Sequence, residues 1–188
     1  MKPLLDLIKQ RRSVRKFKNI TLTYIDLLEL VEAGIYAPSG SNTQCYRFMI
    51  ITNEQDIKFL AKMKIPIVKN APAIILVVAD LSVCSYLRSK RATVFDKLPF
   101  QDCAMAMQNM CLLAESKGIS QCVIHLSDTW YSSTAIKRYF NLENHHELQG
   151  MILLGYADET INLTTAKHAG KLIARKPVDS YLIKRNVQ

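Results

Sequence analysis

Glycine and proline are scarce in this chain, and each occurs only six times among 188 residues. This scarcity excludes a collagen-like or low-complexity chain, and with 49% apolar residues it indicates a single globular domain over residues 1–188. So few glycines also leave little backbone that could wrap around a phosphate group. The sequence has no Gly-x-Gly-x-x-Gly, no Walker A lysine loop and no Gly-x-Ser-x-Gly, so Rossmann dehydrogenases, P-loop enzymes and serine hydrolases lack their signatures.

Long hydrophobic runs are also missing. The longest, Ala71–Ala79, is far shorter than the ~20 apolar residues that a membrane-spanning helix needs. Residues 1–16 turn basic where a secretory signal peptide would be apolar. We therefore expect a cytoplasmic protein without a membrane segment.

Cysteine and histidine show no metal-ligand pattern. The five cysteines are odd in number and none forms a Cys-x-x-Cys pair, which favours reduced thiols in the core. The four histidines lack the spacing of a zinc site, so we expect no bound metal. His145-His146, between Glu143 and Glu147, is predicted to lie in an exposed connection between a helix and a strand.

Positive charge is concentrated near the two ends of the chain. The net charge is +9 and the pI is about 9.4, a balance that is common in nucleic-acid-binding proteins. Residues 9–18 carry +6 and residues 167–188 carry +5, because each has six cations and the second also contains Asp179. Residues 19–166, with 12 cations and 14 acids, carry −2. This distribution favours two basic clusters that converge on one small anion over an extended nucleic-acid surface.

Hydrophobic periodicity indicates an α+β fold in which helices enclose one sheet. Ala73–Ala79 is a continuous apolar run typical of a strand buried on both faces, so we expect it at the centre of the sheet. Residues 81–99 have mixed polarity, and the pattern does not assign their structure, which could be a helix plus a mobile segment. We expect helices over residues 3–10, 24 to before 38, 53–63, 100–117 and 132–140, and strands over 46–52, 73–79, 121–126 and 151–156.

The first candidate site is the segment Arg11-Arg12-Ser13-Val14-Arg15-Lys16-Phe17. Guanidinium groups bind phosphate oxygens through paired donors, and a nearby hydroxyl adds a further donor. If the chain is extended here, Arg11, Ser13 and Arg15 share one side. A solvated basic turn and a nucleic-acid contact are the alternatives, and the lack of interleaved aromatic residues disfavours the second.

The second candidate is the polar loop Pro38-Ser39-Gly40-Ser41-Asn42-Thr43-Gln44. The amides of Asn42 and Gln44 each offer a donor and an acceptor, which suits the edge of a heteroaromatic ring. An ordinary turn between a helix and a strand is the alternative interpretation.

Taken together, these two segments, in this order and at this spacing, resemble the N-terminal signatures of the nitroreductase family of flavin-dependent oxidoreductases. Three later segments are similar to the family as well: Asn70-Ala71-Pro72-Ala73, the helix from Asp102 to Lys117 with its terminal Gly118, and Gly155-Tyr156 followed by Arg175-Lys176-Pro177. The likeness spans nearly the whole chain.

The resemblance implies an α+β sandwich with a central, mainly antiparallel sheet, in an obligate homodimer whose extended termini wrap the partner subunit. It also implies FMN at each interface site, NAD(P)H as electron donor, and ping-pong transfer to nitroaromatics, quinones or similar small acceptors. The cofactor carries this chemistry, so no catalytic side chain is expected. The implied FMN contacts are Arg11, Arg12, Ser13, Arg15 and Arg175 for the phosphate and ribityl chain, Pro38, Ser39, Gly40, Asn42 and Gln44 from the other subunit, and Ile124 and His125 near the reactive edge of the ring.

Two departures from the family pattern bear on substrate preference. Cys45-Tyr46 stands where many relatives have Pro-Trp, and His125 stands where many have a small residue beside the flavin. Three alternatives stay open: a specialised flavin reductase or dehalogenase of the same fold, a flavin-binding sensor without turnover, and a basic nucleic-acid-binding module. The choice between NADH and NADPH also stays open.

Overall fold

The computed structural model describes residues 3–63, 65–88, 97–126, 133–158 and 175–181. In this part of the chain, four strands form one antiparallel sheet in the order β1-β2-β4-β3. The strands are β1 (Tyr46–Ile51), β2 (Ala73–Asp80), β3 (Ser120–His125) and β4 (His146–Gly155).

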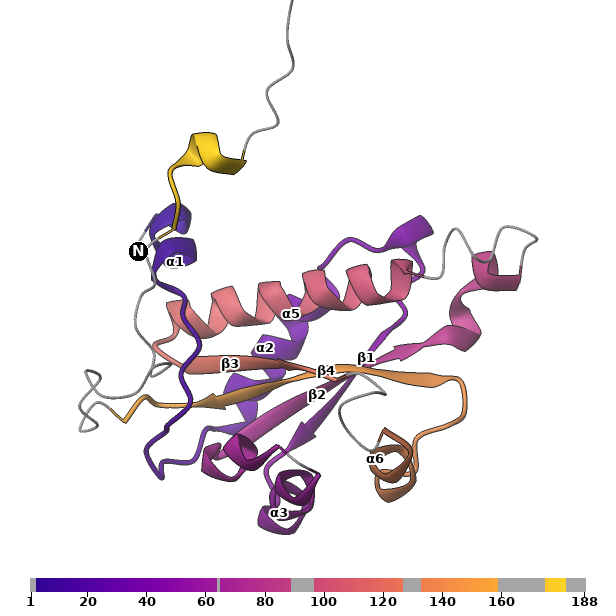
Figure 1. Ribbon diagram of the computed structural model, residues 1–188, viewed down its shortest axis with the longest axis horizontal. Coiled ribbons are helices and arrows are strands. Elements are labelled where there is room, and N and C mark those ends of the chain that lie inside the picture. The colour runs from indigo at the N-terminus through magenta and orange to yellow at the C-terminus, as the bar shows by residue number, and fades with distance from the viewer. Residues whose placement is uncertain (1–2, 64, 89–96, 127–132, 159–174, 182–188) are drawn as a thin grey trace, which may run out of the picture.

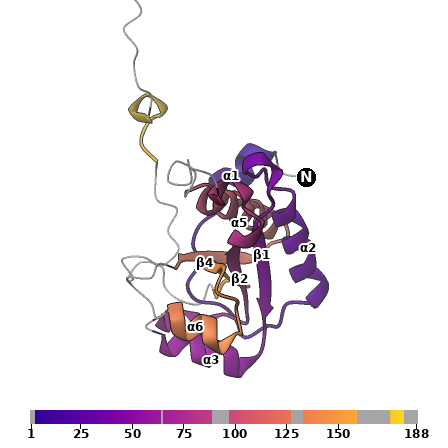
Figure 2. The same ribbon diagram turned by 90° about the vertical axis from the view of Figure 1, so that its right-hand side faces the viewer.

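Two helical layers enclose the sheet, as Figures 1 and 2 show. One layer contains α1 (Leu4–Gln10), α2 (Tyr24–Ile35) and α5 (Leu98–Ser116), and the other contains α3 (Glu54–Lys62) and α6 (Ser133–Tyr139). The expected α+β architecture, with helices around a mainly antiparallel sheet, is confirmed. Short 3-10 turns complete the described chain: η1 (Gly40–Asn42), η2 (Pro66–Asn70), η3 (Leu81–Val83), η4 (Ser85–Arg88) and η5 (Val178–Tyr181).

The strand β2 lies at the centre of the sheet, as its sequence predicts. All eight of its residues are buried, and successive side chains point to opposite faces. Ile75 and Val77 belong to the hydrophobic cluster that includes α2 and α5, whereas Ile74 and Leu76 belong to the cluster that includes α3. This alternation explains why the strand is apolar throughout, since both of its faces meet a helical layer.

The strand β4 begins five residues earlier than the pattern predicts, so the expectation of a strand starting at Met151 was wrong. His146 and Leu148 pair with Asp80 and Val78 of β2, and a register shift follows between Val77 and Val78. The residues before Met151 are mostly polar and lack the apolar pattern of a buried strand. Pairing with β2 nevertheless holds them in the strand conformation. The nearby Gly150 is required sterically, because a Cβ there would lie 2.8 Å from the carbonyl oxygen of Ile124.

The helix boundaries follow their capping residues. The Thr23 hydroxyl accepts a hydrogen bond from the Asp26 N–H at 3.1 Å, and the Asn53 side-chain Oδ1 accepts one from the Gln55 N–H at 2.7 Å. Gly118 ends α5 with a φ of 72°, the left-handed conformation that glycine adopts at such ends. The helix α5 starts two residues before the expected Phe100.

After α1 the chain runs extended beside β3. Ser13 forms a parallel bridge with Gln121, and the Val14 N–H donates to the Gln121 carbonyl at 2.9 Å. Val14 and Phe17 are buried in the cluster on the α3 side of the sheet. The first basic segment is therefore fixed to the edge of the sheet. Within the described ranges, no helix has the length and apolar character to cross a bilayer.

Candidate functional site

Arg11, Ser13 and Arg15 lie close to one thiol of β3. Burial raises the pKa of the Cys122 thiol, whereas Arg15, a hydrogen bond with Ser13, and Arg11 act to lower it. The intervening Val14 is buried in the core. Three alternate residues therefore act on the same group, which agrees with the predicted common side of an extended segment.

The same positive charge extends to the helix α5. Burial raises the pKa of Cys111 to about 12, and Arg11 opposes that rise. None of the groups that shift the pKa of Cys111 or Cys122 is a carboxylate. Arg11 thus influences buried thiols on both β3 and α5, and guanidinium groups at such a place suit an anionic ligand.

Gln121 secures this segment, and sequence reasoning did not assign it a role. Its side chain is fully buried, and its Nε2 donates to the carbonyl of Arg12 at 3.2 Å. Its Oε1 is buried and has no hydrogen-bond partner among the described residues. The one signal in the sequence is an amide directly before the apolar run Cys122–Ile124, since an amide is costly to bury unless it forms hydrogen bonds.

The predicted ring contacts follow on the same strand. Ile124 is half-buried and His125 is exposed, and they pair with Met151 and Gly150 of β4. They lie three and four residues beyond Gln121, which corresponds to about 10 to 13 Å along a strand. A single ligand that contacts both Ser13 and this end of β3 must therefore be elongated.

The loop between α2 and β1 adopts an unusual backbone. Ser41, Asn42 and Gln44 have φ values of 53°, 53° and 49°, in the left-handed region. For residues other than glycine this conformation costs roughly 1–2 kcal/mol each, so the surroundings must maintain it. The Ser39 hydroxyl accepts a hydrogen bond from the Gln44 N–H at 2.9 Å. Pro38 and Asn42 are exposed, and Ser39 and Gly40 are half-buried.

Cys45 and Tyr46, the first of the two departures from the family pattern, directly follow this loop. Cys45 is fully buried, which agrees with the expected packing role, and Tyr46 is 5% exposed. The Tyr46 hydroxyl lies 2.9 Å from the carbonyl of Ile35 and 3.0 Å from that of Ala37. Tyr46 therefore ties the end of α2 to the start of the loop.

Within one chain the loop and the arginine segment lie at opposite ends of α5. The loop contacts the N-terminal end, where Gly40 meets Leu98 and Asp102. Arg11 acts on Cys111, nine residues further on, or about 14 Å along the helix axis. Figure 1 shows η1 over the N-terminal end of α5 and the extended segment after α1 at its other end. The structure does not bring these two parts of the predicted site together in a single chain.

Arg175 lies in the described segment 175–181 and is exposed. The η5 turn of this segment projects beyond α1, away from the sheet, in both views (Figures 1 and 2). The assignment of Arg175 as a phosphate ligand therefore stays a prediction.

A cavity of about 650 Å³ opens on another part of the molecule. Lys16, Lys18, Lys69, Asn70 and Asp158 are among the residues that line it. None of the site residues predicted from the sequence lies in its wall.

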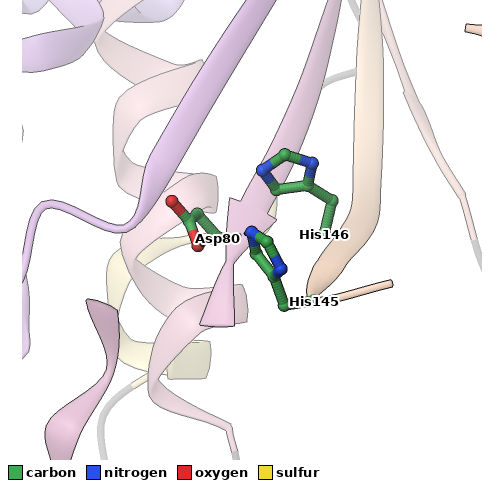
Figure 3. Close-up of side chains that lie close together, drawn as sticks. All are labelled: Asp80, His145 and His146. Carbon is green, nitrogen blue, oxygen red and sulfur yellow. Dashed lines mark ion pairs between the residues drawn. The ribbon is translucent and has the colours of Figure 1, made fainter. Parts of the chain in front are cut away.

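The structure brings His145 and His146 to a carboxylate that sequence reasoning missed. Asp80, at the end of β2, pairs with His146, and the His145 Nε2 lies 3.6 Å from its Oδ1 (Figure 3). One donor atom from each of the three residues lies within 4.8 Å of the others. His145 is exposed in the turn before β4, as predicted, but the cluster has the composition of a metal site.

The hydrogen bonds of this cluster favour a structural role. The Asp80 Oδ1 accepts from the Ser82 N–H at 3.0 Å and from the Ser82 hydroxyl at 2.5 Å, and its Oδ2 accepts from Arg47 at 2.8 Å. The His146 Nδ1 accepts from the Glu143 N–H at 3.1 Å. The proton of a neutral His146 ring then lies on Nε2, which prevents that nitrogen from binding a metal ion.

Comparison with known proteins adds to this geometry. The model of the nitroreductase family matches residues 8–65 and 58–156. A protein of Methanothermobacter thermautotrophicus, provisionally named NADH dehydrogenase/NAD(P)H nitroreductase, is 27% identical over 166 residues, which are 83% of this chain and 78% of the relative. An iodotyrosine deiodinase of Thermotoga neapolitana is 42% identical over 55 residues, or 29% of this chain and 30% of that protein.

The fold is shared with solved structures of nitroreductases. A provisionally named nitroreductase of Desulfovibrio desulfuricans, in complex with FMN, superposes with a TM-score of 0.78 at 23% identity and covers 100% of this chain and 99% of its own. The chain described here belongs to the nitroreductase family.

The Asp80 cluster predicts a pH-dependent contribution to stability. Burial alone would raise the pKa of Asp80, but hydrogen bonds from Ser82 and the charges of Arg47 and His145 together lower it. The ionised carboxylate therefore stabilises the fold above its unfolded pKa of about 3.9, and this stabilisation is lost as the pH falls through the lower folded pKa.

Asp80→Asn should reduce the free energy of unfolding by about 1–3 kcal/mol at pH 7, and by less below about pH 4. Urea unfolding across this range measures it, with Glu32→Gln, an exposed site on α2, as control. A difference that does not depend on pH would contradict the assignment.

Proposed function

We propose that this protein is an FMN-dependent oxidoreductase that passes electrons from NAD(P)H to nitroaromatics, quinones or similar small acceptors in a ping-pong cycle. The observation that carries the proposal is the segment Arg11-Arg12-Ser13-Val14-Arg15, held beside β3 by the Ser13–Gln121 bridge and by the hydrogen bond from the Val14 N–H to the Gln121 carbonyl. Membership of the nitroreductase family and the FMN-bound relative support the choice of cofactor. The name of the archaeal relative supports NAD(P)H as donor.

The donor set of the segment fits the phosphate of FMN. Two guanidinium groups and a hydroxyl at alternate positions provide planar, paired donors for a dianion, and side chains replace the glycine-rich backbone that the sequence lacks. Ile124 and His125, about 10 to 13 Å further along β3, stand where an elongated ligand would place its ring. The residues present therefore fit the cofactor, and Arg12, Pro38, Ser39, Gly40, Asn42, Gln44 and Arg175 complete the proposed contact set.

When bound, FMN accepts a hydride from NAD(P)H and returns electrons to the second substrate. The chain itself contributes binding and orientation: Arg11 and Arg15 hold the phosphate, Ser13 adds a hydroxyl donor, and β3 supports the ring end. No side chain has to donate or remove a proton for the cofactor to be held. All five cysteines are buried and none forms a disulfide, which fits the proposed cytoplasmic location.

We further infer that the working form is a homodimer. The layer of α1, α2 and α5 exposes nine large apolar side chains, whereas the described helices α3 and α6 expose one, Tyr139. Exposed apolar surface on this scale marks an interaction face. The nine are Leu4, Leu5, Ile8, Tyr24, Ile25, Leu28, Ile35, Phe100 and Met105. A partner on this layer would let its loop meet the arginine segment of the first chain, which the loop cannot do within its own chain.

The visible absorbance spectrum of the purified protein tests the function. Yellow protein that bleaches when NADH or NADPH is added under anaerobic conditions, and regains colour with a quinone or a nitroaromatic, is the expected result. A protein that stays colourless after incubation with FMN, and that shifts DNA in a salt-dependent way, would instead support the nucleic-acid module. Bound flavin that never turns over would support the sensor.

A dehalogenase of the same fold is the second candidate. The iodotyrosine deiodinase matches this chain with 42% identity over its 55 aligned residues, against 27% over 166 residues for the Methanothermobacter protein. Release of iodide from an iodinated phenol by the reduced enzyme, faster than reduction of any quinone or nitro compound, would favour it. The position of His125 and the Cys45-Tyr46 pair bear on this choice.

Substitution of the phosphate contacts should weaken FMN specifically. Arg15→Ala, or Arg11→Ala, removes a charge-assisted hydrogen bond of about 1.5–3 kcal/mol, so the dissociation constant for FMN should rise roughly 10- to 150-fold. Riboflavin lacks the phosphate and is the matched ligand control, because its affinity should not change. Fluorescence titration measures both. Unchanged FMN affinity in both variants would contradict the assignment of Arg11 and Arg15 as phosphate ligands.

If each site is shared between two subunits, a mixed dimer of two different defective variants should contain one intact site. Arg15→Ala damages the phosphate half, and Asn42→Gly removes a loop amide while tolerating the left-handed backbone. In a mixed dimer one site carries both changes and the other carries neither. Mixing the variants should therefore recover tight binding of up to one FMN per dimer, measured after subunit exchange. No recovery, with exchange demonstrated, would place both halves in the same chain.

A further inference from the structure

The loop of residues 39–44 needs an anchor outside itself. Several of its hydrogen bonds are local: the Thr43 hydroxyl donates to the Gly40 carbonyl, and the Gln44 Nε2 donates to the Asn42 carbonyl at 3.2 Å. These bonds close the turn but do not attach it to the protein core. Three of its residues are in the left-handed region, so the turn keeps its shape only while its surroundings hold it.

Two side chains outside the loop attach it. Arg47 donates to the Gln44 carbonyl at 2.9 Å, but its side chain is 45% exposed. Asp102 of α5 is 1% exposed, and its Oδ1 and Oδ2 accept from the Gly40 N–H at 3.0 and 3.2 Å. A Cβ at Gly40 would lie 3.1 Å from the Leu98 Cδ1, so the loop also packs closely against the start of α5. The buried anchor is therefore Asp102.

The charge of Asp102 has no ion-pair partner among the described residues. The Cys45 thiol donates a further hydrogen bond to the Asp102 Oδ2 at 3.8 Å. A buried carboxylate without a cation is expensive, and a neutral residue of similar size would pack the helix equally well. What the carboxylate adds is a stronger, charge-assisted bond to one amide of the loop.

We propose that Asp102 is a positioning residue that holds Gly40 and so presents the loop to the flavin of the partner subunit. The proposal rests on the proposed function, since it takes FMN as the ligand that the loop meets. The loop is proposed to contact the ring of the flavin, whereas the arginine segment is proposed to bind its phosphate. Neither the loop sequence nor the helix sequence indicates this pairing, because the two residues are 62 positions apart.

Three variants test the proposal: Asp102→Ala, Asp102→Asn and Leu60→Ala. Asn keeps an oxygen that can accept from Gly40, so it is the conservative rescue. Leu60 is fully buried in the cluster on the α3 side of the sheet and controls for general loss of stability. The readouts are the dissociation constants for FMN and riboflavin, and hydrogen exchange of the Gly40 amide in the flavin-free protein, relative to amides of β2.

Asp102→Ala should weaken FMN and riboflavin by the same factor, tenfold or more, because the loop is proposed to meet the ring and not the phosphate. Arg15→Ala should weaken FMN alone. Exchange at Gly40 relative to β2 should be at least tenfold faster in Asp102→Ala. Asp102→Asn should stay within about threefold of the wild type in all three readouts, and Leu60→Ala should leave the relative exchange unchanged.

Two failures are distinguishable. Wild-type protein that binds no flavin would overturn the proposed function and the flavin part of this proposal together, while the exchange data would still report whether Asp102 holds Gly40. Normal flavin binding in the wild type together with unchanged flavin affinity in Asp102→Ala would overturn the positioning role alone. Equal losses in Asp102→Ala and Leu60→Ala would also overturn it, because they would reduce the effect to general destabilisation.

Discussion

Burial of β2 on both faces is the constraint on which the rest of the structure depends. A strand with eight buried residues needs a helical layer on each side, and this requirement places α5 against one face and α3 against the other. The helix α5 then spans the sheet, with the polar loop at one end and the arginine segment near the other. The separation of the two halves of the predicted site is thus a consequence of packing in the core.

Buried polar groups maintain the local geometry at each half. Gln121 holds the carbonyl of Arg12, Asp102 holds the amide of Gly40, and Asp80 orients Arg47, which in turn reaches Gln44. Gln121, Asp102 and Asp80 are buried. Gln121 and Asp102 bond directly to a backbone atom, and Asp80 bonds to Arg47, which bonds to a backbone carbonyl. A polar group in such a place is costly unless its hydrogen bonds are formed, so these contacts specify one conformation of segments that have little apolar surface of their own.

The elements that could be predicted are those with a strong local signal. The caps Thr23 and Asn53, the terminal Gly118 and the apolar run of β2 led to the correct helices and to the correct central strand. The start of β4 could not be predicted, because His146 and Glu147 are held in a strand only by pairing with β2. The same holds for the Asp80 cluster, whose members have no short-range pattern and meet only through that pairing.

The sequence by itself determined the fold class, the family and the residue types of the two candidate segments, since periodicity, capping and residue type are local properties of the chain. Tertiary structure decided where those segments lie relative to each other, which residues anchor them, and that one chain keeps them apart along α5. Asp102 and Gln121 illustrate the physical reason. Their importance comes from burial and from hydrogen bonds to residues more than 60 positions away, and neither property is visible until the chain is folded.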